Sequence, residues 1–165
     1  MSKTTSLETF THRAASLPDL PKTVYATAIT CIAMYDAFIQ CWYQKYKYNG
    51  VRPETVINEH FDSDWRPYLQ SPAFPEYTCG HSTVSAAGAE ALTEAFGENF
   101  EYTDDTEEEF GIPARSYKSF WHAAEENAWA RFYGGIHFHY SCIVSTDIGK
   151  RVGVDVVKRL KMRAD

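Results

Sequence analysis

The sequence predicts an all-α protein built as a helical bundle. Long apolar stretches with helical spacing are separated by proline and glycine, and alanines recur where helices must pack closely. Of the 165 residues, 44% are hydrophobic and 15% are aromatic, so the chain can bury a core of its own. We therefore interpret residues 1–165 as a single helical domain.

The first predicted helix covers residues 22–45. Residues 1–21 form a polar N-terminal segment that ends in a proline-containing breaker. The stretch that follows is apolar nearly all round, which is typical of a central, buried helix. After it, Pro67, Pro72 and Pro75 predict an irregular connection that continues to residue 75. A connection of this length inside a compact domain is usually functional.

Three further helices are predicted, over residues 80–96, 115–133 and 144–161. The first of these begins near Gly80 or His81 and ends at Gly97, which favours a helix stop. The last ends in a basic turn that complements the negative end of a helix dipole. The apolar stripe of the middle helix and the glycines that follow it are Trp121, Ala124, Ala128, Phe132, Gly134 and Gly135.

The net charge of −6 argues against a nucleic-acid partner, because such proteins usually present a basic surface. Any anion site must therefore be a local basic pocket. The acidic run at residues 104–109 is interpreted as a solvated loop without chemistry.

Cysteine pattern and N-terminal composition bear on the compartment. The four cysteines, at 31, 41, 79 and 142, form no CxxC pair and no disulfide ladder. We see no signal-peptide pattern after Met1, and the apolar run from residue 26 to 38 is too short to span a membrane and contains Asp36. We therefore expect a soluble chain, cytoplasmic by default, without a membrane partner.

Three basic clusters carry the chemistry, within residues 45–81 and 131–137. Each alone is commonplace, but together they supply fixed cations, a flexible backbone N–H and two imidazoles, which suits an oxyanion cage. On a straight helix the side chains of Arg131 and His137 would diverge by about 240°, so we expect the intervening glycines to permit a bend. The clusters are Lys45 with Arg52-Pro53, Cys79-Gly80-His81, and Arg131 with His137.

The order and spacing of these clusters resemble the superfamily that joins vanadium-dependent haloperoxidases to type 2 phosphatidic acid phosphatases. Its pattern is Lys, six residues, Arg-Pro; then Ser-Gly-His; then Arg, five residues, His. The residues before the first two clusters, 36–39 with Trp42 and 74–77, also look like haloperoxidase sequence. The resemblance implies an all-α bundle of the vanadium chloroperoxidase and acid phosphatase type, apparently without the family's upstream helices.

The resemblance also implies roles for individual residues. His81 would be the general acid–base residue, and His137 would be the vanadium ligand of a haloperoxidase or the nucleophile of a phosphatase. Trp42 and Phe74 would line the halide pocket, although both could equally be core aromatic residues. The residues that would bind the oxyanion are Lys45, Arg52, Cys79, Gly80 and Arg131.

The preferred function is halide oxidation by hydrogen peroxide with vanadate as cofactor. A soluble acid phosphatase acting on a phosphate ester at the same site is the first alternative, since phosphate can occupy the place of vanadate. Ser141 stands where phosphatases often have Asp, which favours the haloperoxidase. Cys79 replaces the family serine, and a thiolate there would repel an oxyanion, so a catalytically impaired oxyanion-binding or interaction protein is the second alternative.

Two further interpretations remain open. An apolar first helix without the family's upstream helices would leave a hydrophobic surface, so we expect a homo-oligomer. The alternative of a zinc site is suggested by His137-Phe138-His139, with Cys142, His81 or His60 as further ligands. That pattern is weak, because imidazoles two residues apart diverge on a helix.

Overall fold

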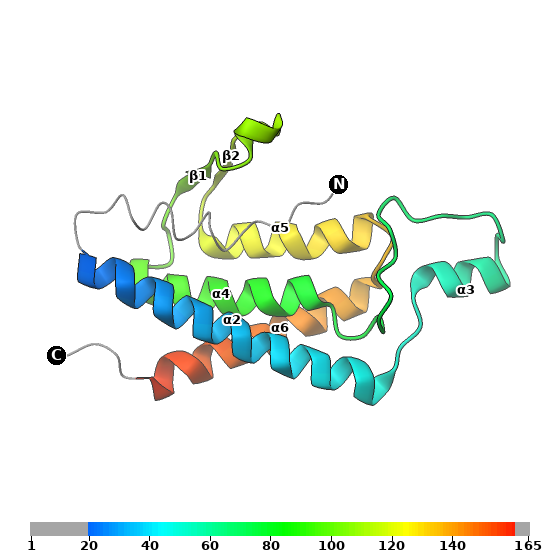
Figure 1. Ribbon diagram of the computed structural model, residues 1–165, viewed down its shortest axis with the longest axis horizontal. Helices are drawn as coiled ribbons and strands as arrows, with labels where there is room; N and C mark the ends of the chain where they lie inside the picture. Colours follow the sequence, from blue (N-terminus) through cyan, green and yellow to red (C-terminus); the bar gives the residue numbers. More distant parts are fainter. Residues whose placement is uncertain (1–19, 161–165) are drawn as a thin grey trace.

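The computed structural model describes residues 20–160 and shows a helical bundle, which confirms the predicted all-α class (Figure 1). Four helices make the bundle, and a short fifth helix lies on an arm beside it. The elements in chain order are α2 (Leu20–Tyr48), α3 (Pro53–His60), α4 (Gly80–Phe96), β1 (Tyr102–Asp104), η1 (Glu108–Phe110), β2 (Arg115–Tyr117), α5 (Phe120–Tyr133) and α6 (His139–Arg159).

Helix α4 is the centre of the bundle and packs against α2, α5 and α6. Small side chains such as Ala86 and Ala87 make its buried faces. The approach of α6 is so close that a Cβ atom added at Gly149 would overlap the carbonyl of Thr83. The glycine is therefore required by packing, and this contact fixes the first turn of α4 against α6.

Helix α2 is buried on one face only, which corrects the expectation of a helix buried all round. Its buried residues, spaced by three or four, include Ala26, Ile29 and Ala33. Because the other described helices lie on one side of α2, its opposite side faces solvent. An apolar stripe on that exposed side consists of Ile32, Tyr35, Ile39, Tyr43 and Tyr46.

By length and composition alone, the segment Leu20–His60 contains a helix apolar enough to cross a membrane. No such segment was expected from the sequence, because the apolar run from residue 26 to 38 is by itself too short to span a membrane. Core helices of soluble proteins and signal sequences meet the same criterion, so it does not assign α2 to a membrane.

The connection between α2 and α4 was expected to be irregular over its whole length, but part of it is helical. Residues Pro53–His60 form α3, with Pro53 at the first helical position, where a missing N–H costs nothing, and Glu54 in the first turn. The prolines that argued against a helix all come later. The chain from residue 61 to 79 is indeed irregular and leads back to the bundle.

Two other boundaries differ from those expected. Residues 115–117 pair with β1 as an antiparallel strand, and α5 starts only at Phe120, after Ser119 accepts a hydrogen bond from the His122 amide. The acidic run begins in β1 and continues through η1. Helix α6 begins five residues earlier than predicted, at His139. The last two residues of the predicted breaker, Leu20 and Pro21, belong to the first turn of α2, whereas residues 1–19 and 161–165, with the end of the basic turn, lie outside the described residues.

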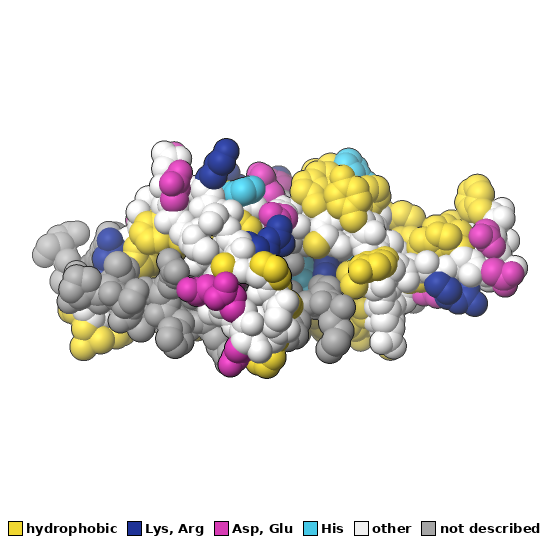
Figure 2. Space-filling model, turned by 90° about the horizontal axis from the view of Figure 1, so that it is seen from above, with side chains coloured by type: hydrophobic (Ala, Val, Ile, Leu, Met, Phe, Trp, Pro, Cys, Tyr) yellow, Lys and Arg dark blue, Asp and Glu magenta, His cyan; other side chains and the backbone are white. Residues whose placement is uncertain are grey.

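Hydrophobic side chains gather on part of the surface above α5 (Figure 2). Figure 2 shows hydrophobic side chains gathered over the C-terminal end of α5 and along the arm that carries α3. At the end of α5, Trp129, Phe132 and Tyr133 form an aromatic cluster that is partly exposed. All four cysteines of the chain are free thiols, and three of them are buried.

Candidate functional site

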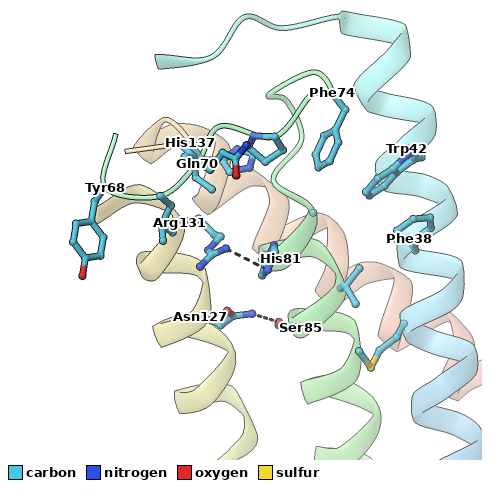
Figure 3. Close-up of a pocket in the computed structure, with 16 residues that line it drawn as sticks. Phe38, Trp42, Tyr68, Gln70, Phe74, His81, Ser85, Asn127, Arg131 and His137 are labelled. Atoms are coloured by element: carbon cyan, nitrogen blue, oxygen red, sulfur yellow. Dashed lines mark hydrogen bonds between the residues drawn. The ribbon is translucent and has the colours of Figure 1, made fainter. Parts of the chain in front are cut away.

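The three motif clusters meet at one end of the bundle, where α2 ends, α4 begins and the chain passes from α5 into α6. A cavity of about 720 Å³ lies there (Figure 3). Its walls come from α2, α4, α5, the connection that follows α3 and the link between α5 and α6. The sequence-predicted site residues that line it are Trp42, Phe74, Gly80, His81, Arg131 and His137.

Lys45, Arg52 and Cys79 are not among the lining residues. They are 0%, 7% and 0% exposed, and they lie behind the cavity wall. The structure therefore divides the expected cage into a layer that faces the cavity and a buried layer that supports it.

The orientation of His137 is fixed from both sides of its ring. Its Nδ1 lies 2.7 Å from Oε1 of Glu76, and its Nε2 lies 3.1 Å from Nη1 of Arg52. A guanidinium can only donate, so Nε2 accepts and Nδ1 carries the proton that it donates to the carboxylate. These contacts select the tautomer whose lone pair is on Nε2.

Glu76 is the functional residue that sequence reasoning missed, since it was noted only as part of a flanking segment. It is 2% exposed, and besides His137 it accepts hydrogen bonds from the Phe138 amide (3.1 Å) and from the Ser141 hydroxyl (2.9 Å). A carboxylate between proline and tyrosine was the available signal, because a charge in an apolar context needs partners. Phosphatases often have Asp at the position of Ser141. Here Glu76 supplies the carboxylate, and the Ser141 hydroxyl donates a hydrogen bond to it.

Arg52 is bound almost entirely by the protein itself. Its Nε and Nη2 donate to the Phe74 carbonyl at 3.2 and 3.1 Å, Nη2 also reaches the Pro75 carbonyl at 3.4 Å, and Nη1 donates to the Ile136 carbonyl at 2.7 Å. The guanidinium thereby joins the connection after α3 to the residue before His137. An atom that binds Nε2 of His137 must replace the Arg52 contact at that nitrogen.

Lys45 retains more donor capacity. Its ammonium donates to the carbonyls of Pro75 and Glu76 at 2.9 and 3.0 Å, and an ammonium has three donors. It lies 5.0 Å from the centre of the Phe74 ring, within cation–π range. Burial lowers the pKa of Lys45.

His81 and Arg131 contact each other in the cavity wall, with His81 Nε2 3.3 Å from Arg131 Nη1 (Figure 3). Burial, followed by the positive charge of Arg131, lowers the pKa of His81 to about 4. His81 is therefore neutral near pH 7 and can accept a proton.

The N-terminus of α4 adds backbone donors to the same wall. Its cap residue, Cys79, makes no side-chain cap hydrogen bond, and Gly80 lines the cavity as the first helical residue. N–H groups at a helix start carry partial positive charge and attract anions. The Cys79 amide itself donates to Ser145 at 2.8 Å, which anchors the turn to α6.

The thiol of Cys79 lies in the buried layer and contacts other protein groups. Burial raises its pKa, but hydrogen bonds with Cys142, His137 and Ser82 outweigh burial and hold the pKa well below the usual value. Cys142, in contrast, has a raised pKa because of its hydrogen bond with Cys79 and its burial.

Gly134 and Gly135 solve the geometric problem of the last cluster. Gly135 has φ of +75°, which ends α5, so Arg131 and His137 do not share a straight helix. A Cβ atom at Gly134 would overlap Leu69 of the connection after α3, whose amide donates to the Gly134 carbonyl at 3.0 Å. The bend brings His137 back to the cavity that Arg131 lines.

Trp42 and Phe74 form an aromatic wall beside these groups. Their ring centres are 5.3 Å apart, and Trp42 stacks on Phe38 at 3.9 Å. Both line the cavity and are half-buried, so they are neither ordinary core residues nor free surface groups.

The zinc alternative is not supported within residues 20–160, where no group of three metal-binding side chains occurs. His137 is engaged by Glu76 and Arg52, whereas His139 is exposed and packs 5.0 Å from the Trp129 ring. His60 lies on α3 beside Glu59.

The residues present fit a tetrahedral or trigonal-bipyramidal oxyanion. An uncapped helix start, the cation of Arg131 and the imidazole of His137 line one cavity, and Lys45 and Arg52 add buried positive charge behind it. Such a donor set suits an anion whose central atom accepts a nitrogen ligand.

The sequence matches the family described as VCPO second helical-bundle domain over residues 25–63 and 58–165. This chain belongs to the vanadium haloperoxidase family. A search of curated proteins found no significant match.

Solved structures of bacterial members of the vanadium haloperoxidase family resemble the chain. The structure described as the first bacterial vanadium-dependent iodoperoxidase shares 47% identity and a TM-score of 0.90, and the match covers 96% of this chain and 40% of that one. A holo-type bacterial vanadium-dependent chloroperoxidase shares 19% identity and a TM-score of 0.68, with 93% and 47% covered; this likeness supports the fold alone. The chain thus spans less than half the length of either relative.

Proposed function

We propose that the cavity is the active site of a vanadate-dependent haloperoxidase that oxidises halide with hydrogen peroxide. The observation that carries the proposal is the state of His137, whose Nδ1 proton is held by Glu76 while Nε2 presents its lone pair toward the cationic cage. Similarity over 96% of the chain to the iodoperoxidase structure supports the same reaction class.

In this proposal His137 holds vanadate, and Glu76 keeps its imidazole oriented and basic. Lys45, Arg52 and Arg131 balance the negative charge of the oxyanion. When bound, vanadate supplies a Lewis acid that activates peroxide toward attack by halide without a change in the oxidation state of vanadium.

A proton from incoming peroxide goes to Nε2 of neutral His81, where it replaces the hydrogen bond from Arg131, and it is returned as water leaves. Its lowered pKa, about 4, keeps it in the basic form at neutral pH. Trp42 and Phe74 bound the side from which a halide approaches, and their rings exclude water from it.

The test uses the full chain loaded with orthovanadate. Triiodide formation from iodide and hydrogen peroxide is followed by absorbance, with bromide and chloride in parallel. We expect turnover that requires vanadate and that falls by at least about 100-fold in His137→Ala. A chain that binds vanadate with His137-dependent affinity but oxidises no halide would contradict the proposal.

The acid phosphatase alternative is strengthened by one observation. A carboxylate on Nδ1 also activates a histidine nucleophile, and Glu76 supplies the acid whose absence at Ser141 had counted against this chemistry. In that case His137 would attack phosphorus and His81 would protonate the leaving oxygen. Hydrolysis of p-nitrophenyl phosphate, inhibited by vanadate and lost in His137→Ala, would identify this function.

A further inference from the structure

The cavity is much larger than its oxyanion end requires. An oxygen atom of water size takes up about 30 Å³, so an anion of four or five oxygens fills roughly 120–150 Å³. The cavity measures about 720 Å³, in the range that usually accepts a small organic molecule. Most of it lies beyond the reach of His81, Arg131 and His137, and this remaining part has its own chemistry.

Beyond the oxyanion groups, one wall of the cavity is apolar and aromatic. Phe38 and Trp42 of α2 stack at 3.9 Å with an interplanar angle of 19°. Met34, one turn before Phe38, and Val84 of α4 line the same cavity. A planar ring placed here would bury both of its faces against apolar side chains.

A polar pair stands within the same cavity. Asn127 Nδ2 donates to Ser85 Oγ at 2.6 Å, and both residues line the cavity (Figure 3). Each is four residues from a member of the His81–Arg131 pair, on the same helix. The two polar pairs therefore form successive rungs between α4 and α5, about one helical turn or 5–6 Å apart.

The second rung has spare hydrogen-bonding capacity. Once Asn127 Nδ2 has donated to Ser85 Oγ, the serine can still donate its proton and the amide oxygen of Asn127 can still accept. These two functions match one hydroxyl group on a ligand, which donates and accepts once each. The distance to the first rung equals the width of an aromatic ring.

We propose that the cavity binds a phenol-type aromatic molecule, with its hydroxyl on Ser85 and Asn127 and its ring against Phe38 and Trp42. This inference rests on the proposed function, in which the phenol is the acceptor of the oxidised halogen. The ring carbon supplies the electron pair of the new carbon–halogen bond, the halogen–oxygen bond of hypohalous acid breaks, and the released hydroxide takes the ring proton as water. Halogenation thus occurs on a bound and oriented substrate.

Binding is measured first without vanadate, so that the result does not depend on halide oxidation. Calorimetry with 4-propylphenol and with propylbenzene compares two probes that differ only in the hydroxyl. We expect the phenol to bind more tightly, and Asn127→Leu and Ser85→Ala each to weaken it about five-fold while leaving propylbenzene unchanged. Phe38→Ala should weaken both probes.

Ser116→Ala is the matched control, because Ser116 makes an exposed hydrogen bond with Thr103 on the β1–β2 hairpin and does not line the cavity. Thermal unfolding of every variant establishes that it is folded, and Ser85→Ala remains informative if Asn127→Leu is not. Equal affinity for the two probes, or phenol binding that neither polar variant weakens, would overturn the proposal.

A second measurement tests orientation in the vanadate-loaded chain. The ratio of ortho to para iodination of phenol should differ from that given by free hypoiodous acid, and Asn127→Leu should return it to the free value. If the native chain oxidises iodide but gives the same ortho to para ratio as free hypoiodous acid, the proposal is overturned. Absence of halide oxidation would contradict the proposed function alone, since the binding comparison is independent of it.

Discussion

His137 Nδ1 lies 2.7 Å from Glu76 Oε1, across 61 residues of sequence, and both side chains are at least 96% buried. The carboxylate reaches the ring from the connection before α4, whereas the histidine stands just before α6. Because Glu76 also accepts hydrogen bonds from the Phe138 amide and the Ser141 hydroxyl, its charge is stabilised and its position is fixed.

Replacing Glu76 by Gln should weaken vanadate binding by about ten-fold or more. The neutral amide keeps the size of the side chain but loses the charge that makes Nε2 a stronger ligand. Vanadium NMR titration of the full chain measures the affinity. Ser141→Ala, which removes one support but leaves the Glu76–His137 contact, should have a smaller effect; equal losses in the two variants would contradict a role for the carboxylate.

Arg52→Lys should destabilise the fold as well as the site. Lysine keeps the positive charge but cannot reach the carbonyls of Phe74 and Ile136 together, so buried acceptors lose their donors. We expect a loss of about 2–4 kcal/mol in the free energy of unfolding, measured by denaturant titration. Arg151→Lys, on an exposed ion pair with Asp147, is the control and should cost under about 0.5 kcal/mol. A similar small loss for Arg52 would disprove its bridging role.

Sequence reasoning located the bundle and the three clusters because both depend on local patterns. Helical spacing and the stop at Gly97 set α4 correctly. Helix α3 was missed because proline was counted as a breaker over a whole region, although Pro53 begins a helix. A proline must be judged by its position in the element, which a composition argument ignores.

The support of the site could not be read from the sequence, since it depends on contacts between distant segments. Spacing placed Arg52 among the anion ligands, but whether its donors face an anion or carbonyls is decided by the path of residues 74–76. Likewise, the absence of Asp at position 141 was interpreted as a lost acid, whereas the fold brings Glu76 to the same histidine. The sequence around Glu76 signals only that its charge needs a partner, and the fold alone shows that the partner is His137.

His81 should take up a proton when an oxyanion binds. Its pKa of about 4 in the folded chain, below the ordinary 6.5, means that the fold favours the neutral form. That contribution to stability is present above pH 6.5 and is lost as the pH falls through 4. A bound dianion favours the charged imidazole and raises the pKa, so binding near pH 5.5 should be coupled to protonation.

Calorimetry with sulfate, which does not titrate in this range, tests the coupling. The apparent enthalpy at pH 5.5 should depend on the ionisation enthalpy of the buffer for the native chain, and His81→Gln should remove most of that dependence. Identical enthalpies in two buffers would contradict the coupling.

The exposed apolar stripe of α2 is the surface through which we expect two copies of the chain to associate. Tyr35, Ile39 and Tyr43 recur at four-residue spacing and are 67%, 51% and 61% exposed. Two copies that pack these stripes together would bury aromatic and aliphatic area that water otherwise contacts. We expect sedimentation to show a dimer that Ile39→Glu dissociates, whereas Glu94→Gln on α4 leaves it intact. A monomer at micromolar concentrations would contradict this prediction.

Cys79→Ser should decide whether the substitution at this position impairs the site. Hydrogen bonds with Cys142 and Ser82 help to hold the Cys79 pKa well below its usual value, which favours a thiolate in the buried layer behind the cavity wall, where it repels an oxyanion and reacts with peroxide. Serine keeps a hydroxyl in the same place without the charge, so vanadate affinity should rise several-fold.

Preincubation with hydrogen peroxide should inactivate the native chain but spare the variant, as thiol titration and residual vanadate binding would record. Cys31→Ser, on α2 away from the cavity lining, should behave as the native chain does. If the native chain and Cys79→Ser bind vanadate equally and are equally sensitive to peroxide, Cys79 does not impair the site.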